Sequence, residues 1–216
     1  MSDKSKIILI NGTSSAGKSS LAKAIQSLAR DPYQIVSLDE YRDGMPDRFR
    51  GLNSESDEPG VNGLNVVAKS VNGSRLTHIE FGLYGEKVLR GMKLAVVQLA
   101  KLGINVIVDD MVTYREAAHD YASLFQPFHT IVIGVHCDLD VLKRREQQRE
   151  GRFPGTAEMQ LSVVHRWMQY DLNIDTTYRS SLGGAIEALS TLTTSRQSRA
   201  IDRMFKNYKL SHPVSD

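Results

Sequence analysis

Gly12-Thr13-Ser14-Ser15-Ala16-Gly17-Lys18-Ser19 is a complete phosphate-binding loop of the form GxxxxGK[ST]. The apolar run at residues 7–10 (IILI) precedes it as a buried strand would, and apolar residues recur at helical spacing over residues 21–29. A chance match in a polar loop would have neither neighbour. The segment is therefore predicted to run from a strand, through the loop, into a helix.

The chemistry of this loop predicts a nucleotide site. Gly12 and Gly17 allow successive backbone N–H groups to point at one spot, to which the following helix adds its positive end. Lys18 reaches the β- and γ-phosphates, and the Ser19 hydroxyl is a ligand for the accompanying Mg²⁺. We therefore expect a nucleoside triphosphate as partner, with ATP and Mg²⁺ as cofactors. The predicted nucleotide-binding residues are Gly12, Thr13, Ser14, Ser15, Ala16, Gly17, Lys18, Ser19 and Ser20.

The composition fits one compact domain. The chain has 216 residues, 41% of them hydrophobic, which is enough for a core of its own. Its net charge of +2 is too small to indicate nucleic acid as a partner. No signal-peptide region precedes the first strand, and no stretch approaches the ~18 apolar residues of a membrane span. With a single cysteine, Cys137, these features predict a cytoplasmic protein without a membrane partner.

Alternating strand-like and helical segments indicate an α/β fold. Strands are predicted at residues 6–11, 34–38, 104–109, 130–136 and 172–175. Helices are predicted at residues 18–30, about 80–102, about 114–124, 138–150, 156–170 and 180–192. This order predicts a mainly parallel sheet with helices on both faces. Ligands of such sheets bind at the carboxyl ends of the strands, so the residues that follow each strand are the candidates for a site.

Residues 50–78 differ in composition from the rest of the chain. They are rich in Asn, Ser, Gly and acidic residues, and they carry turn signals at Pro59-Gly60 and Asn72-Gly73. We therefore expect a long loop here. Because it follows the second strand, an excursion that covers the substrate side is favoured over a mobile surface loop.

The predicted domain spans residues 1–192, and residues 193–216 form a basic C-terminal extension. Ile201, Met204 and Phe205 could place an apolar stripe on a short helix within this extension. Such a helix would dock on the body of the protein or on a second subunit, which leaves a homo-oligomer open.

Asp39 is the candidate general base and a candidate substrate-binding residue. It follows the strand predicted at residues 34–38, which places it beside the phosphate-binding loop. Phosphoryl transfer requires a carboxylate that orients the attacking hydroxyl and accepts its proton. The alternatives are an N-cap of a short helix over the following Glu-Tyr-Arg, or a place in the outer sphere of the metal.

Asp109 and Asp110 end the third predicted strand. A carboxylate at this position usually holds Mg²⁺ or its waters opposite the loop serine. Adjacent carboxylates point in different directions, so one is expected to serve the metal and the other the acceptor. The sequence leaves the division open; the working assignment is Ser19 and Asp109 for the metal and Asp110 for the substrate.

Arginines punctuate the segment after the fourth strand. By spacing, Arg145, Arg149 and Arg152 fall on one helical face. Arginines that close over a triphosphate would neutralise the charge on the transferred group, so these three are candidate catalytic residues of a lid at about 143–156, together with Lys18. The alternative is a solvated charged face, paired with Glu146 and Glu150.

Two further patterns are assigned no chemistry. His165 and Trp167 fall in the helix predicted at residues 156–170 beside Val163 and Val164, which favours packing. Asp57-Glu58-Pro59-Gly60 has the D-x-x-G form of GTPases, but no strand precedes it and the chain has no Asn-Lys-x-Asp motif.

The chain resembles the chloramphenicol phosphotransferase-like family of P-loop kinases over about residues 6–192. The loop sequence Ser-Ser-Ala-Gly-Lys-Ser and the segment Ile-Asp-Thr-Thr are fairly specific in combination. The segments that carry the resemblance are IILINGTSSAGKSS (7–20), VSLDEYRDGMP (36–46), GINVIVDD (103–110), GVHCD (134–138), RREQQREGR (144–152), VVH (163–165) and YDLNIDTT (170–177).

The resemblance implies the P-loop kinase fold: a five-stranded parallel sheet, helices on both faces and an arginine-bearing lid. The named member of the family transfers the γ-phosphate of ATP to a primary hydroxyl of an antibiotic. Position by position, Lys18 and Ser19 match the phosphate and Mg²⁺ residues, and Asp39 matches the general base. The lid arginines of the family are matched by Arg145, Arg149 and Arg152.

The leading prediction is an ATP-dependent kinase of a small-molecule hydroxyl, with chloramphenicol as one candidate acceptor. Residues 47–78 do not match the acceptor-covering region of the family, so the acceptor is not identified. The alternatives are a nucleoside, nucleotide or polynucleotide-end kinase, and a nucleotide-dependent switch without an acceptor. Asp39 favours a kinase, because a switch needs only a positioned water, commonly held by Gln.

Overall fold

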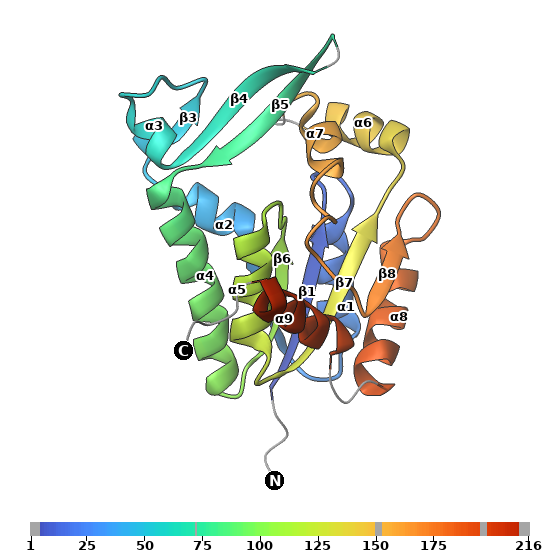
Figure 1. Cartoon of the computed structure of the whole chain (residues 1–216). Coiled ribbons are helices and arrows are strands. Elements are labelled where there is room, and N and C mark those ends of the chain that lie inside the picture. Colours follow the sequence, from blue (N-terminus) through green and yellow to red (C-terminus); the bar gives the residue numbers. More distant parts are fainter. Residues whose placement is uncertain (1–4, 72, 150–152, 195–197, 212–216) are drawn as a thin grey trace.

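The structure is a computed structural model that describes residues 5–71, 73–149, 153–194 and 198–211 (Figure 1). Along the chain, the secondary-structure elements differ from the prediction mainly between the strands predicted at residues 34–38 and 104–109. The elements are β1 (Lys6–Gly12), α1 (Lys18–Leu28), β2 (Tyr33–Ser37), α2 (Leu38–Asp43), the 3-10 turn η1 (Asp47–Phe49), β3 (Arg50–Leu52), α3 (Pro59–Asn62), β4 (Leu64–Val71), β5 (Ser74–Phe81), α4 (Leu83–Lys101), β6 (Asn105–Asp110), α5 (Arg115–Phe125), β7 (His129–His136), α6 (Leu139–Gln147), α7 (Thr156–Leu161), β8 (Leu172–Asp175), α8 (Ser181–Thr194) and α9 (Arg199–Ser211).

The central sheet has five strands, all parallel, in the order β2-β6-β1-β7-β8. This confirms the predicted α/β fold with a five-stranded parallel sheet. β1 lies in the middle, and its register pairs Ile10 with Asp109 on β6. Ser37 at the end of β2 pairs with Asp109 as well. The carboxyl ends of these three strands therefore lie at one edge, together with the loop that follows β1.

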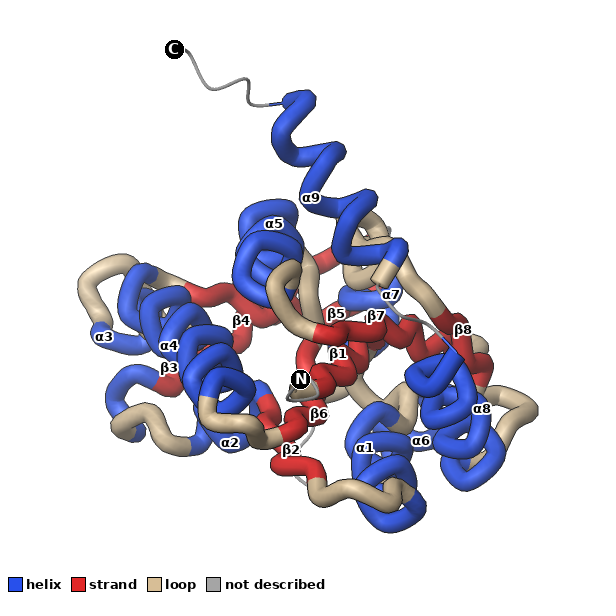
Figure 2. Tube along the Cα trace, turned by 90° about the horizontal axis from the view of Figure 1, so that it is seen from below, coloured by secondary structure: helices blue, strands red, loops and turns tan. Residues whose placement is uncertain are grey.

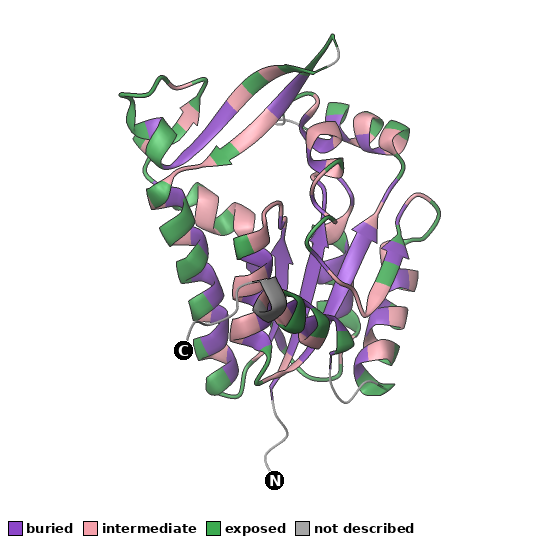
Figure 3. Ribbon diagram, viewed as in Figure 1, coloured by how far each residue is buried: buried purple, intermediate pink, exposed green. Residues whose placement is uncertain are grey.

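Alternate residues of the buried strands supply two cores, one on each face of the sheet. Ile7 and Leu9 of β1 pack with residues of α4, α5 and α9, whereas Ile8 and Ile10 pack with residues of α1 and α8. Figure 2 shows the two sets of helices on opposite faces. Figure 3 shows the central strands buried between them. A strand covered on both faces has no polar side, which is why residues 7–10 are continuously apolar.

Residues 50–78 contradict the prediction of a long loop. β3, β4 and β5 form a second, three-stranded sheet, in which β4 and β5 are antiparallel from Leu64↔Phe81 to Val71↔Ser74. Gly73 is a turn glycine with φ +79°, whereas other glycines of this region allow close backbone contacts. A Cβ atom at Gly63 would overlap the carbonyl oxygen of Phe49, and one at Gly82 would overlap that of Val61. The polar composition comes in part from the turns at residues 53–58, which hold the acidic residues, and in part from the exposed positions of the small sheet.

The helix predicted at residues 156–170 is also wrong in its length. α7 ends at Leu161, and turns follow it through Trp167. The β-branched pair Val163-Val164 has low helix propensity. In addition, the Asn11 side chain donates a hydrogen bond of 2.8 Å to the Val164 carbonyl oxygen. This contact with the central strand replaces continued helical hydrogen bonding.

The C-terminal extension contains the expected amphipathic helix, α9, and it packs on the body of the chain. Ile201 and Met204 are buried in the same core as residues of α5. Asp171 holds the start of α9, because its carboxylate accepts hydrogen bonds from the Ser198 hydroxyl (2.6 Å) and the Ala200 N–H (3.0 Å). Over the described ranges, no helix is both long and apolar enough to cross a membrane.

Candidate active site

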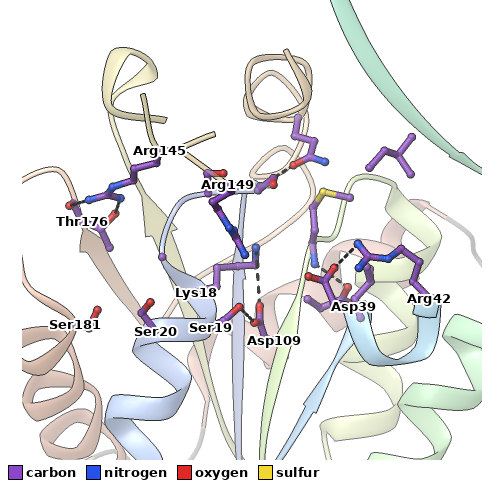
Figure 4. A pocket seen from close by; sticks show the side chains of 18 of the residues that line it. Lys18, Ser19, Ser20, Asp39, Arg42, Asp109, Arg145, Arg149, Thr176 and Ser181 are labelled. Atoms are coloured by element: carbon purple, nitrogen blue, oxygen red, sulfur yellow. Dashed lines mark hydrogen bonds and ion pairs between the residues drawn. The ribbon is translucent and has the colours of Figure 1, made fainter. Parts of the chain in front are cut away.

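A cavity of about 640 Å³ opens at the carboxyl ends of β1, β2 and β6 (Figure 4). The phosphate-binding loop and α1 form its floor, α2 and the β4–β5 hairpin form one side, and the segment after α6 forms another. The lining residues that the argument uses are Ser14, Lys18, Ser19, Ser20, Asp39, Arg42, Asp109, Asp110, Arg145, Arg149, Gln160 and Thr176.

The loop has the backbone conformation that phosphate binding needs. Gly17 has φ +92° and caps α1, and this left-handed conformation favours glycine. Lys18 reaches back over the loop, where its Nζ donates a hydrogen bond of 3.0 Å to the Thr13 carbonyl oxygen. The same Nζ lies 3.9 Å from Asp109, and the Lys18 side chain is 12% exposed. The loop and its lysine therefore lie together at the floor of the cavity.

Ser19 and Asp109 are in direct contact, as expected for the two predicted metal residues. The Ser19 hydroxyl donates a hydrogen bond of 2.5 Å to Asp109 Oδ2. A hydroxyl and a carboxylate are the hard oxygen ligands that Mg²⁺ prefers. In the described part of the chain no group of three or more His, Cys, Asp or Glu side chains could hold a metal.

Asp110 lines the cavity, but both of its carboxylate oxygens already accept hydrogen bonds from the protein. Oδ1 accepts from the Met111 N–H at 2.7 Å, and Oδ2 accepts from the Tyr121 hydroxyl. Burial of Tyr121, together with the nearby Asp110 charge, raises the pKa of this phenol well above its usual value. Asp110 therefore positions the end of β6 against α5. A role toward the substrate stays a prediction for this residue.

Asp39 faces the cavity from the first turn of α2. The N-cap of this helix is Ser37, which forms a capping box with Glu40, so the alternative of Asp39 as the cap is wrong. Asp39 Oδ1 accepts a hydrogen bond of 2.7 Å from Arg42 Nη1, one turn later on α2. Figure 4 shows this pair across the cavity floor from Lys18. Arg42 thus orients the carboxylate that was predicted to be the general base.

Arg145 and Arg149, the two predicted lid arginines that the structure describes, do not share one helical face. α6 ends at Gln147, so Arg149 lies beyond the helix. Arg145 stays on α6 and donates hydrogen bonds to the Thr176 carbonyl oxygen (2.8 Å) and hydroxyl (3.2 Å). Arg149 lines the cavity, and Figure 4 shows it directed toward Lys18. Arg152 lies outside the described residues.

Glu146 was considered as an ion-pair partner of the arginines, but in the structure its carboxylate binds the backbone at the start of α7. Its side chain is 6% exposed, and its carboxylate accepts hydrogen bonds from the N–H groups of Gly155 (2.8 Å) and Ala157 (2.9 Å) at the start of α7. A carboxylate at a helix N-terminus stabilises the unpaired amides there. Glu146 therefore fixes α7 to α6 and is no part of a solvated charged face.

Two contacts to the phosphate-binding loop could not be predicted. Gln160 of α7 accepts a hydrogen bond of 2.7 Å from the Ser14 N–H through Oε1. The Thr176 hydroxyl donates a hydrogen bond of 2.7 Å to the Ala16 carbonyl oxygen. Thr176 belongs to the Ile-Asp-Thr-Thr segment of the family resemblance, which was a signal without a role. Gln160 had no sequence signal at all.

His165 lies behind the loop in a small aromatic cluster. Its Nδ1 is 2.6 Å from the Tyr170 hydroxyl, which also accepts a hydrogen bond from Asn11, and its ring stacks on His136 with centroids 4.2 Å apart. Burial, and then the neighbouring His136, lower the pKa of His165 to about 4. The packing prediction suits His165. It is wrong for Trp167, which is 41% exposed and lies beside Arg115.

Relatives in sequence are phosphotransferases by name. The chain is 30% identical over 172 residues to the "Putative O-phosphotransferase Rv2636" of Mycobacterium tuberculosis strain H37Rv, covering 80% of this chain and 75% of that protein. A protein of strain CDC 1551 / Oshkosh, "Putative O-phosphotransferase MT2714", matches to the same extent.

Similar solved structures share the fold at low sequence identity. The Mycobacterium tuberculosis APS kinase CysC, in complex with AMPPNP and APS, has a TM-score of 0.61 at 16% identity and covers 88% of this chain and 99% of its own. A gluconokinase from Sinorhizobium meliloti 1021 has a TM-score of 0.56 at 16% identity, and the match covers 97% of this chain and 99% of the gluconokinase chain.

A family model described as chloramphenicol phosphotransferase-like protein matches residues 5–193. The matched range includes the phosphate-binding loop, Asp39 after β2, the carboxylates at the end of β6, and Arg145 and Arg149. The chain belongs to the chloramphenicol phosphotransferase-like family of P-loop kinases.

Proposed function

We propose that the protein transfers the γ-phosphate of ATP to a hydroxyl group of a small molecule. The observation that carries this proposal is the position of Asp39. Its carboxylate lines the same cavity as Lys18 and the Ser19–Asp109 pair. A carboxylate at this place can orient an acceptor hydroxyl and take its proton beside the phosphates.

The nucleotide would bind along the floor of the cavity. The N–H groups of the loop and the start of α1 would hold the phosphates, and Lys18 would neutralise the β- and γ-phosphates. Ser19 and Asp109 would hold Mg²⁺, which when bound neutralises phosphate charge during transfer. Ser20 lines the same cavity on the side of Ser181 (Figure 4), and the rest of the nucleotide would lie along α1.

The acceptor would enter between α2 and the β4–β5 hairpin. Leu64, Ile79 and Phe81 of the hairpin line the cavity and give this side an apolar wall. Residues 50–78 would thus cover the substrate side as a folded sheet. The Thr77 hydroxyl donates a hydrogen bond of 2.8 Å to the Pro154 carbonyl oxygen, which joins this cover to the segment proposed as the lid, residues 143–156.

An ATP-consumption screen tests the proposal. Purified protein is supplied with ATP, Mg²⁺ and a panel of hydroxylated antibiotics including chloramphenicol, nucleosides, sugars and a 5′-hydroxyl oligonucleotide. Phosphorylated products are identified by mass spectrometry. We expect consumption that depends on one class of small hydroxylated acceptor, and a Lys18→Ala variant that folds but is inactive, because it lacks charge stabilisation at the phosphates.

Three outcomes would reject the proposal. Phosphorylation of the oligonucleotide alone would indicate an end kinase. ATP hydrolysis at the same rate with and without every acceptor would indicate a nucleotide-dependent switch. A Lys18→Ala variant that turns over at the wild-type rate would show that the loop is not the active site.

A further inference from the structure

The peptide bond between Thr13 and Ser14 is held from both sides. Its carbonyl oxygen accepts the hydrogen bond of 3.0 Å from Lys18 Nζ, and its N–H donates the hydrogen bond of 2.7 Å to Gln160 Oε1. The N–H groups of this loop are the donors that cradle phosphates in a P-loop. A side-chain carbonyl of the protein therefore occupies one of the phosphate-binding donors.

Gln160 is placed to exchange this contact for another. The side chain is 6% exposed and lines the cavity from α7. A carboxamide accepts through its oxygen and donates twice through its nitrogen. Within residues 5–71, 73–149, 153–194 and 198–211, no hydrogen bond from Gln160 Nε2 is formed, so its donor end is available to a ligand in the cavity.

The loop around this contact has further polar groups without partners. The hydroxyl oxygens of Ser14 and Ser15 are buried, and neither forms a hydrogen bond within the described residues. Buried polar groups are normally paired, so unpaired ones mark a place where a polar ligand belongs. Lys18 identifies which part of the ligand this is, because the lysine of such a loop contacts the β- and γ-phosphates.

We propose that Gln160 is a γ-phosphate-contacting residue that makes the site discriminate tri- from diphosphate nucleotides. On binding of the triphosphate, the Ser14 N–H would pass from Gln160 Oε1 to the phosphate. The side-chain amide would turn and donate from Nε2 to a γ-phosphate oxygen. A diphosphate would leave the bond to Ser14 in place. This inference rests on the proposed function, because it takes the loop to bind a nucleoside triphosphate.

α7 connects Gln160 to α6, the helix that carries Arg145. Glu146 of α6 holds the first amides of α7, whose other end carries Gln160. A contact between Gln160 and the γ-phosphate would therefore also hold α6, and with it the contact of Arg145 with Thr176, when a triphosphate is bound.

Nucleotide binding without turnover tests this inference. The affinities of AMPPNP and ADP are measured by calorimetry for the wild type and for Gln160→Met, Gln160→Glu and Ser162→Ala, each with Mg²⁺ present. Met keeps the volume of Gln without its amide, and Glu keeps the acceptor but cannot donate. Ser162 is an exposed residue just after α7 and serves as the matched control. Thermal unfolding establishes that each variant folds.

The preference of the wild type for AMPPNP over ADP should fall about tenfold in Gln160→Met, the size of one hydrogen bond to a charged group, and further in Gln160→Glu, through repulsion. Ser162→Ala should keep the wild-type preference. Equal losses of affinity for AMPPNP and ADP in the Gln160 variants would overturn the proposal and show that Gln160 only stabilises the loop. An unchanged preference for AMPPNP would overturn it as well. If the wild type binds neither nucleotide, the proposed function itself fails.

Discussion

Arg145 donates two hydrogen bonds to Thr176, one of 2.8 Å to its carbonyl oxygen and one of 3.2 Å to its hydroxyl group. The Thr176 hydroxyl in turn donates to the Ala16 carbonyl oxygen of the phosphate-binding loop. Arg145 therefore supports the wall of the loop from outside, whereas Arg149 reaches toward Lys18 (Figure 4). Two arginines that were predicted to act together lie in different positions, and their substitutions should differ.

Arg149→Ala should lower kcat by about 10²–10³ with little change in ATP affinity. The loop amides and Lys18 already hold the phosphates, so an arginine above them contributes mainly when charge develops on the transferred group. Arg149→Lys should restore only part of the rate, because Lys lacks the planar fork of donors. Steady-state kinetics measures kcat for both variants. A kcat of Arg149→Ala within about twofold of the wild type would contradict a catalytic role.

Arg145→Ala should act first on stability and nucleotide affinity. The variant loses three hydrogen bonds of a partly buried guanidinium, two to Thr176 and one of 3.4 Å to Cys137 Sγ, and leaves the Thr176 carbonyl without its donor, which costs roughly 1–3 kcal/mol. We expect a lower free energy of unfolding in urea and a higher KM for ATP, with a smaller loss of kcat than in Arg149→Ala. Unchanged stability with a kcat loss equal to that of Arg149→Ala would show instead that both arginines act on the transferred phosphate.

The parts of this molecule that the sequence predicts are those with a local cause. The phosphate-binding loop is contiguous, so residues 12–19 are sufficient to identify it. The three inner strands, β6, β1 and β7, are recognisable because each contains a short buried apolar run, whereas the edge strands β2 and β8 are only partly buried. The placement of Asp39 and Asp109 follows, since both come directly after such runs. These predictions needed no knowledge of contacts between distant residues.

The parts that were missed depend on such contacts. Gln160 and Ser14 are 146 positions apart, so no pattern links them. The end of α6 was predicted too late, which wrongly placed Arg149 on a helical face. The β4–β5 hairpin was hidden because its exposed polar residues, its turn glycine and the close-packed glycines on either side of it, Gly63 and Gly82, imitate the composition of a loop. In each case a tertiary contact outweighed the local preference.

Ile201→Ala should destabilise the protein by about 2–4 kcal/mol, although the residue lies in the extension after residue 192. Ile201 is 2% exposed and packs in the core beside residues of α5, so its truncation leaves a cavity. Arg203→Ala, an exposed position on the same helix, should stay within about 0.5 kcal/mol of the wild type. Urea unfolding compares the three proteins. A neutral Ile201→Ala would show that α9 is not part of the stable core.

The stability of the protein should fall between pH 6.5 and pH 4 through His165. Its pKa in the folded state is about 4, lowered from 6.5, so the unfolded chain binds a proton in this window that the folded chain does not. Stability is therefore fully present above pH 6.5 and is lost as the pH falls. The side chain is partly exposed, so the loss should be on the order of 1–2 kcal/mol.

Urea unfolding at several pH values in this window measures the effect in the wild type and in His165→Gln. The Gln variant can still accept from the Tyr170 hydroxyl but has no proton to gain, so its stability should depend less on pH. All other titratable groups are common to both proteins, and the difference isolates His165. Identical pH profiles would mean that His165 titrates near its ordinary value.

Asp39→Asn should keep nucleotide binding and lose turnover by roughly 10²–10⁴, the range of general-base catalysis. The amide has the size of the carboxylate and can still lie against Arg42, but it cannot take the proton of the acceptor. Asp43→Asn is the matched control, because Asp43 also contacts Arg42, at 2.8 Å, and does not line the cavity. Calorimetry with AMPPNP and kinetics with the acceptor separate binding from transfer.

If Asp39→Asn instead abolishes AMPPNP binding in the presence of Mg²⁺ while turnover per bound nucleotide is preserved, Asp39 belongs to the metal site. If Asp43→Asn is as inactive as Asp39→Asn, the shared contact with Arg42, and not proton transfer, is what the site needs.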